Sequence, residues 1–271
     1  MKTLLLRGPS RDAYQARIAT LESLATYPIG EDFFQLDHGS DYFAFFDRLG
    51  QTDYFVVREG QRVVGVCCNV LRRVPDRLGG KLRRAWYACD LKVHPEYRGR
   101  RIPHRIANYA FLREYLRCPR GYAITMNPKG GPQANRVLKI ADRWWNPTST
   151  PAQLEIYSLD AAVMARLRPT LEAQRGPIRF LSLRGVKDVV LQSTGLPMPL
   201  LHVQWGAFPT EGPGRLLEEP QLEHAHMFCA PEGSGLARLV AEAGVAPFAT
   251  ATVLSHRMPA CDWSFVLTSE I

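Results

Sequence analysis

The segment Leu91–Ile106 reads LKVHPEYRGRRIPHRI and holds the residues of this chain whose types and spacing best suit chemistry. A hydrophobic run ends at Val93, a turn follows at His94-Pro95, and the arginine-rich stretch Arg98–Arg101 leads into an amphipathic pattern. Backbone N–H groups at the start of a helix, with arginines beside them, bind anionic groups such as phosphates. The segment therefore predicts a site for an anionic group between a strand and a helix.

This segment resembles the acyl-CoA pyrophosphate loop of the GNAT (GCN5-related N-acetyltransferase) family. That loop reads Q or R, two variable residues, G, one variable residue, and G or A, after a strand that often ends V-x-P. Val93-His94-Pro95 matches the strand end, and Arg98 matches the opening position. Arg101 stands where the first glycine is expected, and its Cβ limits how closely a pyrophosphate approaches. Pro103 stands at the small-residue position and lacks an N–H donor, although proline is tolerated in the first turn of a helix.

The resemblance implies where an acyl donor would bind. The donor is acetyl-CoA or another acyl-CoA, and no metal is expected. Its pantetheine arm would follow the backbone of Leu91 and Val93. A later run that begins at Asn135 resembles the family pattern N-x-x-A/S-x-x-x-Y, which makes Asn135 a further candidate. The pyrophosphate would lie over five consecutive residues: Arg98, Gly99, Arg100, Arg101 and Ile102.

Catalytic roles are also implied by the resemblance, because the family transfers an acyl group to an amine that must lose a proton. Tyr87 stands where the family often has its base, and a phenol is a poor base unless its pKa falls. Asp90 is the one carboxylate on the strand, and it equally suits an ion pair with a neighbouring arginine. Asp142 occupies the place of the tyrosine that protonates the thiolate, so Tyr157 is the candidate replacement unless the thiolate leaves unassisted.

The elements that must position this site follow from hydrophobic periodicity and turn signals. Helices are expected from Ser10 to Tyr27 and at Asp41–Leu49, Arg101–Arg117 and Pro132–Arg143. Strands are expected at Lys2–Arg7, Tyr54–Arg58, Arg62–Leu71, Leu82–Val93, Tyr122–Met126 and Gln153–Leu159. This order predicts an α+β fold with a GNAT-like mixed, mostly antiparallel sheet flanked by helices. We place this acyl-CoA-binding domain at residues 1–150.

Residues 151–271 are expected to form a second α/β half, either a degenerate GNAT-like unit or an accessory fold, without a phosphate loop of its own. It would close the sheet, shape the acceptor pocket or support a homodimer. Helices are expected at Ala161–Ala173 and near Gly235–Ala243, with a loop at Phe208–Pro220. Strands are expected at Ile178–Leu183, Leu200–Trp205, His224–Cys229, Phe248–His256 and Trp263–Thr268.

Charge divides the chain unevenly. The net charge is +8, and residues 1–145 hold 25 Lys and Arg against 14 Asp and Glu, while residues 146–271 hold 9 against 12. A basic half attracts a nucleotide cofactor, an acidic substrate or a nucleic acid. Nucleic acid is the weakest of these, because the basic residues do not interleave with aromatic ones. No C-x-x-C pair and no run of 18 apolar residues occurs, so we expect a cytoplasmic protein without a membrane span.

These patterns predict an N-acyltransferase that moves an acetyl or other acyl group from acyl-CoA to an amine on a small molecule or peptide. The alternative is a catalytically inactive GNAT-fold module that binds a ligand or regulates a partner. The missing glycine and tyrosine favour that alternative. Trp144-Trp145 could line an acceptor pocket, although paired aromatics after a helix are more often part of a core.

Overall fold

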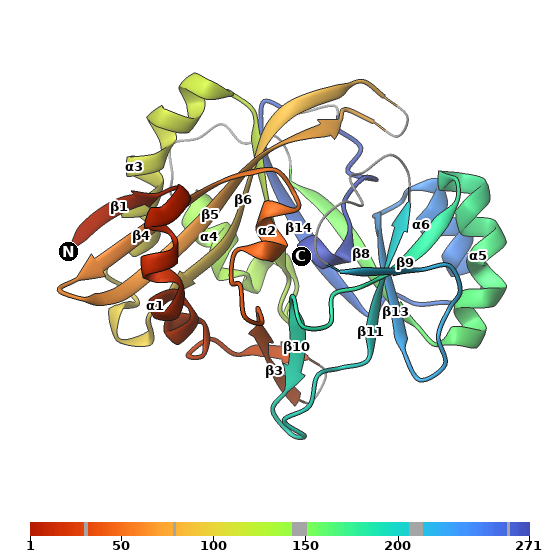
Figure 1. The fold of residues 1–271 in the computed structure, drawn as a ribbon. Helices are drawn as coiled ribbons and strands as arrows, with labels where there is room; N and C mark the ends of the chain where they lie inside the picture. The colour runs from red at the N-terminus through yellow and green to blue at the C-terminus, as the bar shows by residue number, and fades with distance from the viewer. Residues whose placement is uncertain (30–31, 78–79, 143–150, 206–213, 259–260) are drawn as a thin grey trace.

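The computed structural model describes residues 1–29, 32–77, 80–142, 151–205, 214–258 and 261–271 (Figure 1). The first half contains β1 (Lys2–Leu6), α1 (Asp12–Glu22), β2 (Tyr27–Ile29), β3 (Asp32–Asp37), α2 (Ala44–Asp47), β4 (Gln51–Glu59), β5 (Arg62–Pro75), β6 (Leu82–Val93), α3 (Ile102–Arg117), β7 (Gly121–Met126) and α4 (Arg136–Asp142). The second half contains β8 (Ala152–Leu159), α5 (Ala161–Arg175), β9 (Ile178–Ser182), β10 (Asp188–Leu191), β11 (Leu200–Trp205), β12 (Arg215–Leu217), β13 (Ala225–Pro231), α6 (Gly235–Glu242) and β14 (Ala249–His256).

Eleven of these strands form one sheet, in the order β1-β4-β5-β6-β7-β14-β8-β13-β11-β9-β12. A small second sheet has the order β10-β3-β2. In the large sheet most neighbours are antiparallel, and the described parallel pairs are β6 with β7 and β11 with β13. The predicted α+β class, with a mixed and mostly antiparallel sheet flanked by helices, is therefore confirmed.

The alternation of side chains along β5 explains why helices cover both faces of the sheet. Val63 points into a core that includes Ile18 and Leu21 of α1. Val64, the next residue, points into another core with Ile102 and Ile106 of α3. α1 and α3 therefore lie on opposite faces, and the strands between them are buried on both sides.

The two predicted halves share the large sheet. β14, the last strand of the chain, lies between β7 and β8 and pairs antiparallel with both of them. Figure 1 shows this blue strand beside the green strands near the centre of the molecule. A second core, which includes Met164 and Leu171 of α5, fills the C-terminal half.

Several local expectations differ from the structure. Trp263–Thr268 is not a strand, because Trp263 has φ 55° and the Val266 N–H closes a turn on the Trp263 carbonyl at 3.1 Å. Trp263, Phe265 and Val266 pack into the first core, and a short 3-10 helix follows at Thr268–Glu270. The helix after Ser10 begins at Asp12 and ends at Glu22, since Gly8–Ser10 forms a 3-10 turn of its own.

Two more expectations concern segments that the structure covers in part. The first part of the expected loop Phe208–Pro220, up to residue 213, lies outside the described part of the chain. Within the described part of this segment, Arg215–Leu217 forms β12. Trp144 and Trp145 also lie outside it. No helix within the described ranges is long and apolar enough to cross a membrane.

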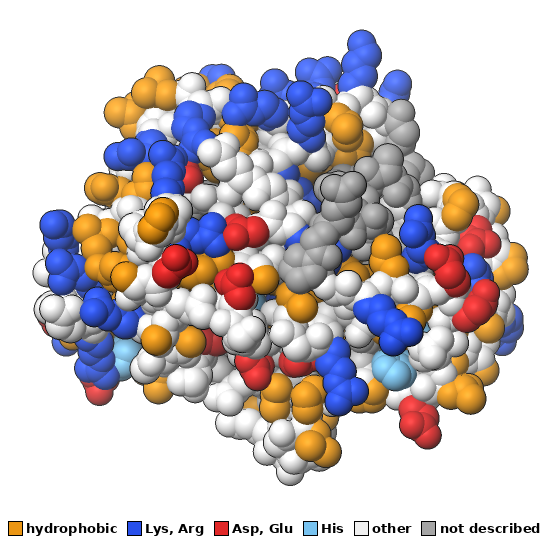
Figure 2. Space-filling model, in the orientation of Figure 1, with side chains coloured by type: hydrophobic (Ala, Val, Ile, Leu, Met, Phe, Trp, Pro, Cys, Tyr) orange, Lys and Arg blue, Asp and Glu red, His pale blue; other side chains and the backbone are white. Residues whose placement is uncertain are grey.

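The surface reflects the uneven charge of the sequence. Figure 2 shows Lys and Arg side chains gathered at the left and top of this face, where Figure 1 places β1 and β4 and the far ends of β5 and β6. The first half therefore presents a basic surface, as the counts of charged residues predict.

Candidate functional site

A β-bulge interrupts β6 just before the arginine-rich loop. Val66 of β5 pairs with Lys92 and Cys68 pairs with Cys89, so Asp90 and Leu91 together oppose one residue of β5. Asp90 has a positive φ of 56°, a left-handed conformation that is uncommon for a residue with a side chain. Bulges of this kind bend a strand and are frequent next to active sites.

The pairing of β6 with β7 ends close to this bulge. The two strands pair in parallel through Trp86–Ala88 and Gly121–Ala123, and no further pairs of these strands are described. Beyond this point β6 continues to Val93 beside β5, and β7 continues to Met126 beside β14. The edge of β6 from Cys89 onward therefore has backbone groups without a strand partner on the side of β7.

The loop after β6 combines left-handed backbone with N–H groups that have no described acceptor. Gly99 has φ 81°, and Arg101, the residue before α3, has φ 56° and ψ 31°. The N–H groups of Gly99, Arg101 and Ile102 have no acceptor within the described part of the chain. Successive free N–H groups at a helix N-terminus form a concave site for an anion. Arg101 thus has a left-handed backbone of the kind that glycine adopts without strain.

The arginines of this loop are exposed. The Arg100 guanidinium lies 4.7 Å from the ring centre of Tyr97, and the Tyr97 hydroxyl donates a 2.5 Å hydrogen bond to Glu59. Arg98, Arg100 and Arg101 form no ion pair with any described residue. Their charges are therefore available to a ligand, while Tyr97 fixes the turn that carries them.

Asn135 lies at the end of β7. Its side-chain amide donates a 3.0 Å hydrogen bond to the Met126 carbonyl, and its carbonyl oxygen accepts a 2.9 Å bond from the Val137 N–H. The side chain is buried and ties the start of α4 to β7. The structure shows a positioning role for Asn135 and does not test whether it contacts a cofactor.

Tyr87 is buried on β6. Its ring stacks on Tyr122 with 5.0 Å between centroids, and its hydroxyl donates to the backbone carbonyl of Glu270. Burial raises the pKa of the Tyr87 hydroxyl well above its usual value. A phenol in this environment holds its proton, which does not suit the role of a general base.

Asp90 belongs to a buried cluster of charged groups. The Lys92 ammonium donates to the Asp90 carboxylate and pairs with Glu22 of α1. The Tyr42 hydroxyl lies 2.7 Å from Asp90 Oδ2, 3.1 Å from Glu22 Oε2 and 3.0 Å from Lys92 Nζ. The ion pair that the sequence suggests for Asp90 is therefore present, with Lys92 rather than an arginine.

Burial shifts the ionisation of this cluster. It lowers the pKa of the Lys92 ammonium, against the attraction of Glu22, and raises the pKa of the Tyr42 hydroxyl. The neighbouring His38 ring has its pKa lowered to about 2 by burial and by Lys92. Glu22, His38 and Asp90 each place a potential ligand atom within 4.8 Å of the others. The Lys92 ammonium already lies against both carboxylates, so the cluster carries its own cation.

Tyr157 is placed elsewhere. Its strand, β8, is separated from β6 by β7 and β14, and its ring stacks on Phe228 in the second core. Its hydroxyl donates a 2.6 Å hydrogen bond to Glu155, and burial raises its pKa. The structure therefore groups Tyr87, Asp90 and the loop around β6, and does not bring Tyr157 to them.

Sequence reasoning missed Glu22, His38, Tyr42 and Lys92. Lys92 carries a local signal, because it lies two residues from Asp90 on one strand. Glu22 and Tyr42 carry none, since they come from α1 and from the segment before α2 and approach β6 only in the folded chain.

Comparison with known proteins gives distant similarities. No family model matches the chain. The uncharacterised protein L340 of Acanthamoeba polyphaga mimivirus is 23% identical over 240 residues, which cover 86% of this chain and 68% of that protein.

Among solved structures, a tandem GNAT protein from the clavulanic acid biosynthesis pathway is similar over 95% of this chain and 99% of its own, with 14% identity and a TM-score of 0.45. A GCN5-related N-acetyltransferase from Anabaena variabilis matches 96% of this chain and 74% of its own, with 10% identity and a TM-score of 0.45. A GCN5-related N-acetyltransferase from Kribbella flavida matches 94% of this chain and 70% of its own, with 10% identity and a TM-score of 0.42.

Proposed function

We propose that this chain is a GNAT-like N-acyltransferase that moves an acetyl or other acyl group from acyl-CoA to an amine of a small molecule or peptide. The observation that carries the proposal is the set of free N–H groups on Gly99, Arg101 and Ile102 at the start of α3. They follow a strand whose pairing with β7 ends before its bulge. This arrangement suits a long ligand with a pyrophosphate at one end.

In this proposal the pyrophosphate accepts hydrogen bonds from the loop N–H groups and from Arg98 and Arg100. The pantetheine arm follows the free edge of β6 at Leu91 and Val93, and the thioester lies beside the bulge. Asp90 is on that bulge, with the Tyr42 hydroxyl 2.7 Å away, so this pair is the candidate for holding the proton that the amine releases. Tyr87 is a less suitable base because its hydroxyl is already donated to Glu270.

One site per chain is part of the proposal. In the C-terminal half, the turn before α6 begins with Glu232, and the Ser234 side chain accepts the Ala237 N–H at 3.2 Å. A helix start that is capped by its own chain, with a carboxylate beside it, has little capacity for a pyrophosphate.

The second candidate function is a GNAT-fold module that binds acyl-CoA or a partner without catalysis. The Asp90–Lys92 ion pair favours it, because a carboxylate held by an ammonium is a weak base.

Calorimetry with CoA and acetyl-CoA, followed by a thiol-release assay with a panel of amines, tests both functions. The acyltransferase is supported by one bound CoA per chain and by thiol release that depends on the amine. Binding without release supports the inactive module. If neither compound binds, the acyltransferase and the acyl-CoA-binding form of the module are both overturned.

A further inference from the structure

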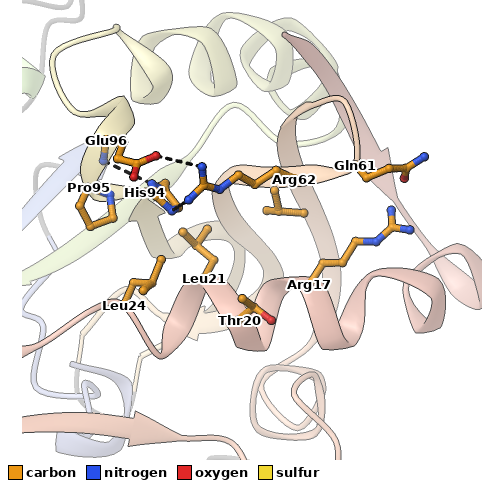
Figure 3. A pocket seen from close by; sticks show the side chains of 10 residues that line it. Arg17, Thr20, Leu21, Leu24, Gln61, Arg62, His94, Pro95 and Glu96 are labelled. Carbon is orange, nitrogen blue, oxygen red and sulfur yellow. Dashed lines mark hydrogen bonds and ion pairs between the residues drawn. The ribbon is translucent and has the colours of Figure 1, made fainter.

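A pocket of about 520 Å³ lies on the face of the sheet that α1 covers, opposite α3 and its loop. Figure 3 shows α1 below the pocket and the residues of β5 and of the β6–α3 connection above it. Its volume is typical of sites for small molecules. The residues that line it include Leu21 of α1, Leu24 just after α1, Arg62 and Val63 of β5, and His94 and Glu96 after β6.

The pocket contains a conflict between hydrogen-bond donors. His94 is 5% exposed, and donors approach both nitrogens of its ring. The Glu96 backbone N–H lies 3.3 Å from Nδ1, and the Arg62 guanidinium lies 2.7 Å from Nε2. A neutral imidazole accepts at one nitrogen, and a protonated one accepts at neither. At least one of the two contacts therefore joins two donors in either state, and in the protonated state both do.

An anionic oxygen between Arg62 and His94 would remove this conflict. Nδ1 would then accept from Glu96, and the Nε2–H and the Arg62 guanidinium would both donate to the same oxygen. Arg62 is free to turn, because its 2.9 Å ion pair with Glu96 is between side chains that are 52% and 66% exposed. Ion pairs as exposed as this one contribute little stability.

The rest of the pocket indicates the class of anion. Arg62 already pairs with one carboxylate, that of Glu96, through a single 2.9 Å contact, and guanidinium groups bind carboxylates strongly. Glu96 also repels a dianion such as phosphate more strongly than a monoanion. Leu21, Leu24 and Val63 give the pocket an apolar wall that suits a short hydrocarbon body.

We infer that this pocket binds an organic monocarboxylate with an apolar body, held by Arg62 and His94. Two sources share this chemistry, a free alkanoate and the carboxyl end of a peptide. The pocket is separate from the proposed acyl-CoA loop. Val63 lines the pocket and faces α1, whereas Val64 faces α3, the helix into which the loop leads, on the opposite side of the sheet.

Calorimetry of the full chain with hexanoate, N-acetylleucine and the neutral control hexanamide tests this inference. We expect one of the two carboxylates to bind, and hexanamide to bind at least about tenfold more weakly, since a hydrogen bond to a charged group is lost. Preference for hexanoate identifies an alkanoate site, and preference for N-acetylleucine identifies a peptide end. Equal binding of hexanamide, or no binding of either carboxylate, overturns the inference.

The variants Arg62→Gln and Arg113→Gln make a matched pair, because Arg113 is an exposed arginine of α3 on the other face. Arg62→Gln should weaken carboxylate binding at least about tenfold, and Arg113→Gln should leave it unchanged. Equal effects of the two substitutions contradict the site. Arg98→Ala separates this inference from the proposed function, because it should weaken CoA binding and leave carboxylate binding intact. A variant that loses both ligands would show that the two sites are one.

Discussion

Lys92 and Asp90 lie two residues apart on β6, at the bulge, and the ammonium of one donates to the carboxylate of the other. The same ammonium pairs with Glu22 of α1, so one lysine joins the bulge to the helix that covers it. Asp90 has a left-handed backbone, which is strained for a residue with a side chain. The ion pair therefore helps to hold the bulged conformation of β6, beyond the point where its pairing with β7 ends.

Replacing Lys92 by methionine should destabilise the protein by about 3–5 kcal/mol, because the carboxylates of Glu22 and Asp90 would stay buried without a cation. Urea unfolding measures the change. The triple variant Lys92→Met, Glu22→Gln, Asp90→Asn is the control, and it should recover much of the loss since none of the three charges is left without its partner. A loss below about 1 kcal/mol in the single variant would contradict a structural role for the cluster.

Arg101→Gly should stabilise the protein by about 0.5–1 kcal/mol, because Arg101 has φ 56° and glycine adopts that conformation without strain. It should also tighten CoA binding, since removing the Cβ lets a phosphate approach the N–H groups more closely. Thermal unfolding and calorimetry measure the two effects. Arg100→Gly is the matched control, because the backbone of Arg100 does not have positive φ, and it should bring no gain in stability.

Arg98→Ala and Arg100→Ala should each weaken CoA binding by about 1.5–3 kcal/mol, the usual contribution of a hydrogen bond to a charged group. Both side chains are exposed and form no ion pair with any other described residue, so neither change should disturb the fold. Calorimetry measures the affinity, with Arg113→Ala on the exposed side of α3 as the control. Unchanged affinity in both variants would place the pyrophosphate elsewhere.

Glu114 of α3 should make stability fall as the pH rises. Burial, together with its hydrogen bond to Asp53, raises the pKa of the Glu114 carboxyl from 4.5 to about 8, although Arg117 lies 3.3 Å away. The Arg117 guanidinium lies closer to Asp53, with Nη1 2.5 Å from Oδ2, so it stabilises the negative charge of Asp53 more than that of Glu114. The proton therefore stays on Glu114. Between pH 4.5, the ordinary pKa of a glutamate, and about pH 8, its pKa in the fold, folded Glu114 holds a proton that the unfolded chain releases. Glu114 therefore favours folding at low pH.

The variant Glu114→Gln isolates this effect, because the amide cannot titrate. Its free energy of unfolding relative to the unchanged protein should rise between about pH 5 and pH 8, as measured by urea unfolding at both values. The relative measure matters because His38, with its pKa lowered by burial, contributes the opposite slope below its ordinary value of 6.5. A constant difference between the two proteins would show that Glu114 is ionised in the fold.

The sequence predicts those elements whose structure depends on the pattern of neighbouring residues. The hydrophobic run of β6, the glycine at position 99 and the periodicity of Ile102 and Ile106 predict the strand, loop and helix that the structure contains. The cluster around Lys92 could not be predicted, because it joins residues from α1, the segment before α2, and β6. The aromatic pattern at Trp263–Thr268 fits a strand, yet those side chains fill a core without any strand pairing.

Removing the C-terminal half should leave a fragment of poor solubility, although residues 1–150 contain the whole proposed acyl-CoA loop. β14 fills the place between β7 and β8, so a chain that ends at residue 150 exposes the edge of β7. It also exposes Tyr87 and Tyr122, which the segment from Trp263 to Glu270 covers. An unpaired edge beside exposed aromatic side chains favours aggregation. Light scattering and circular dichroism of this fragment test the expectation, with the full chain as control. A soluble fragment that binds CoA as tightly as the full chain would show that the first half folds without β14.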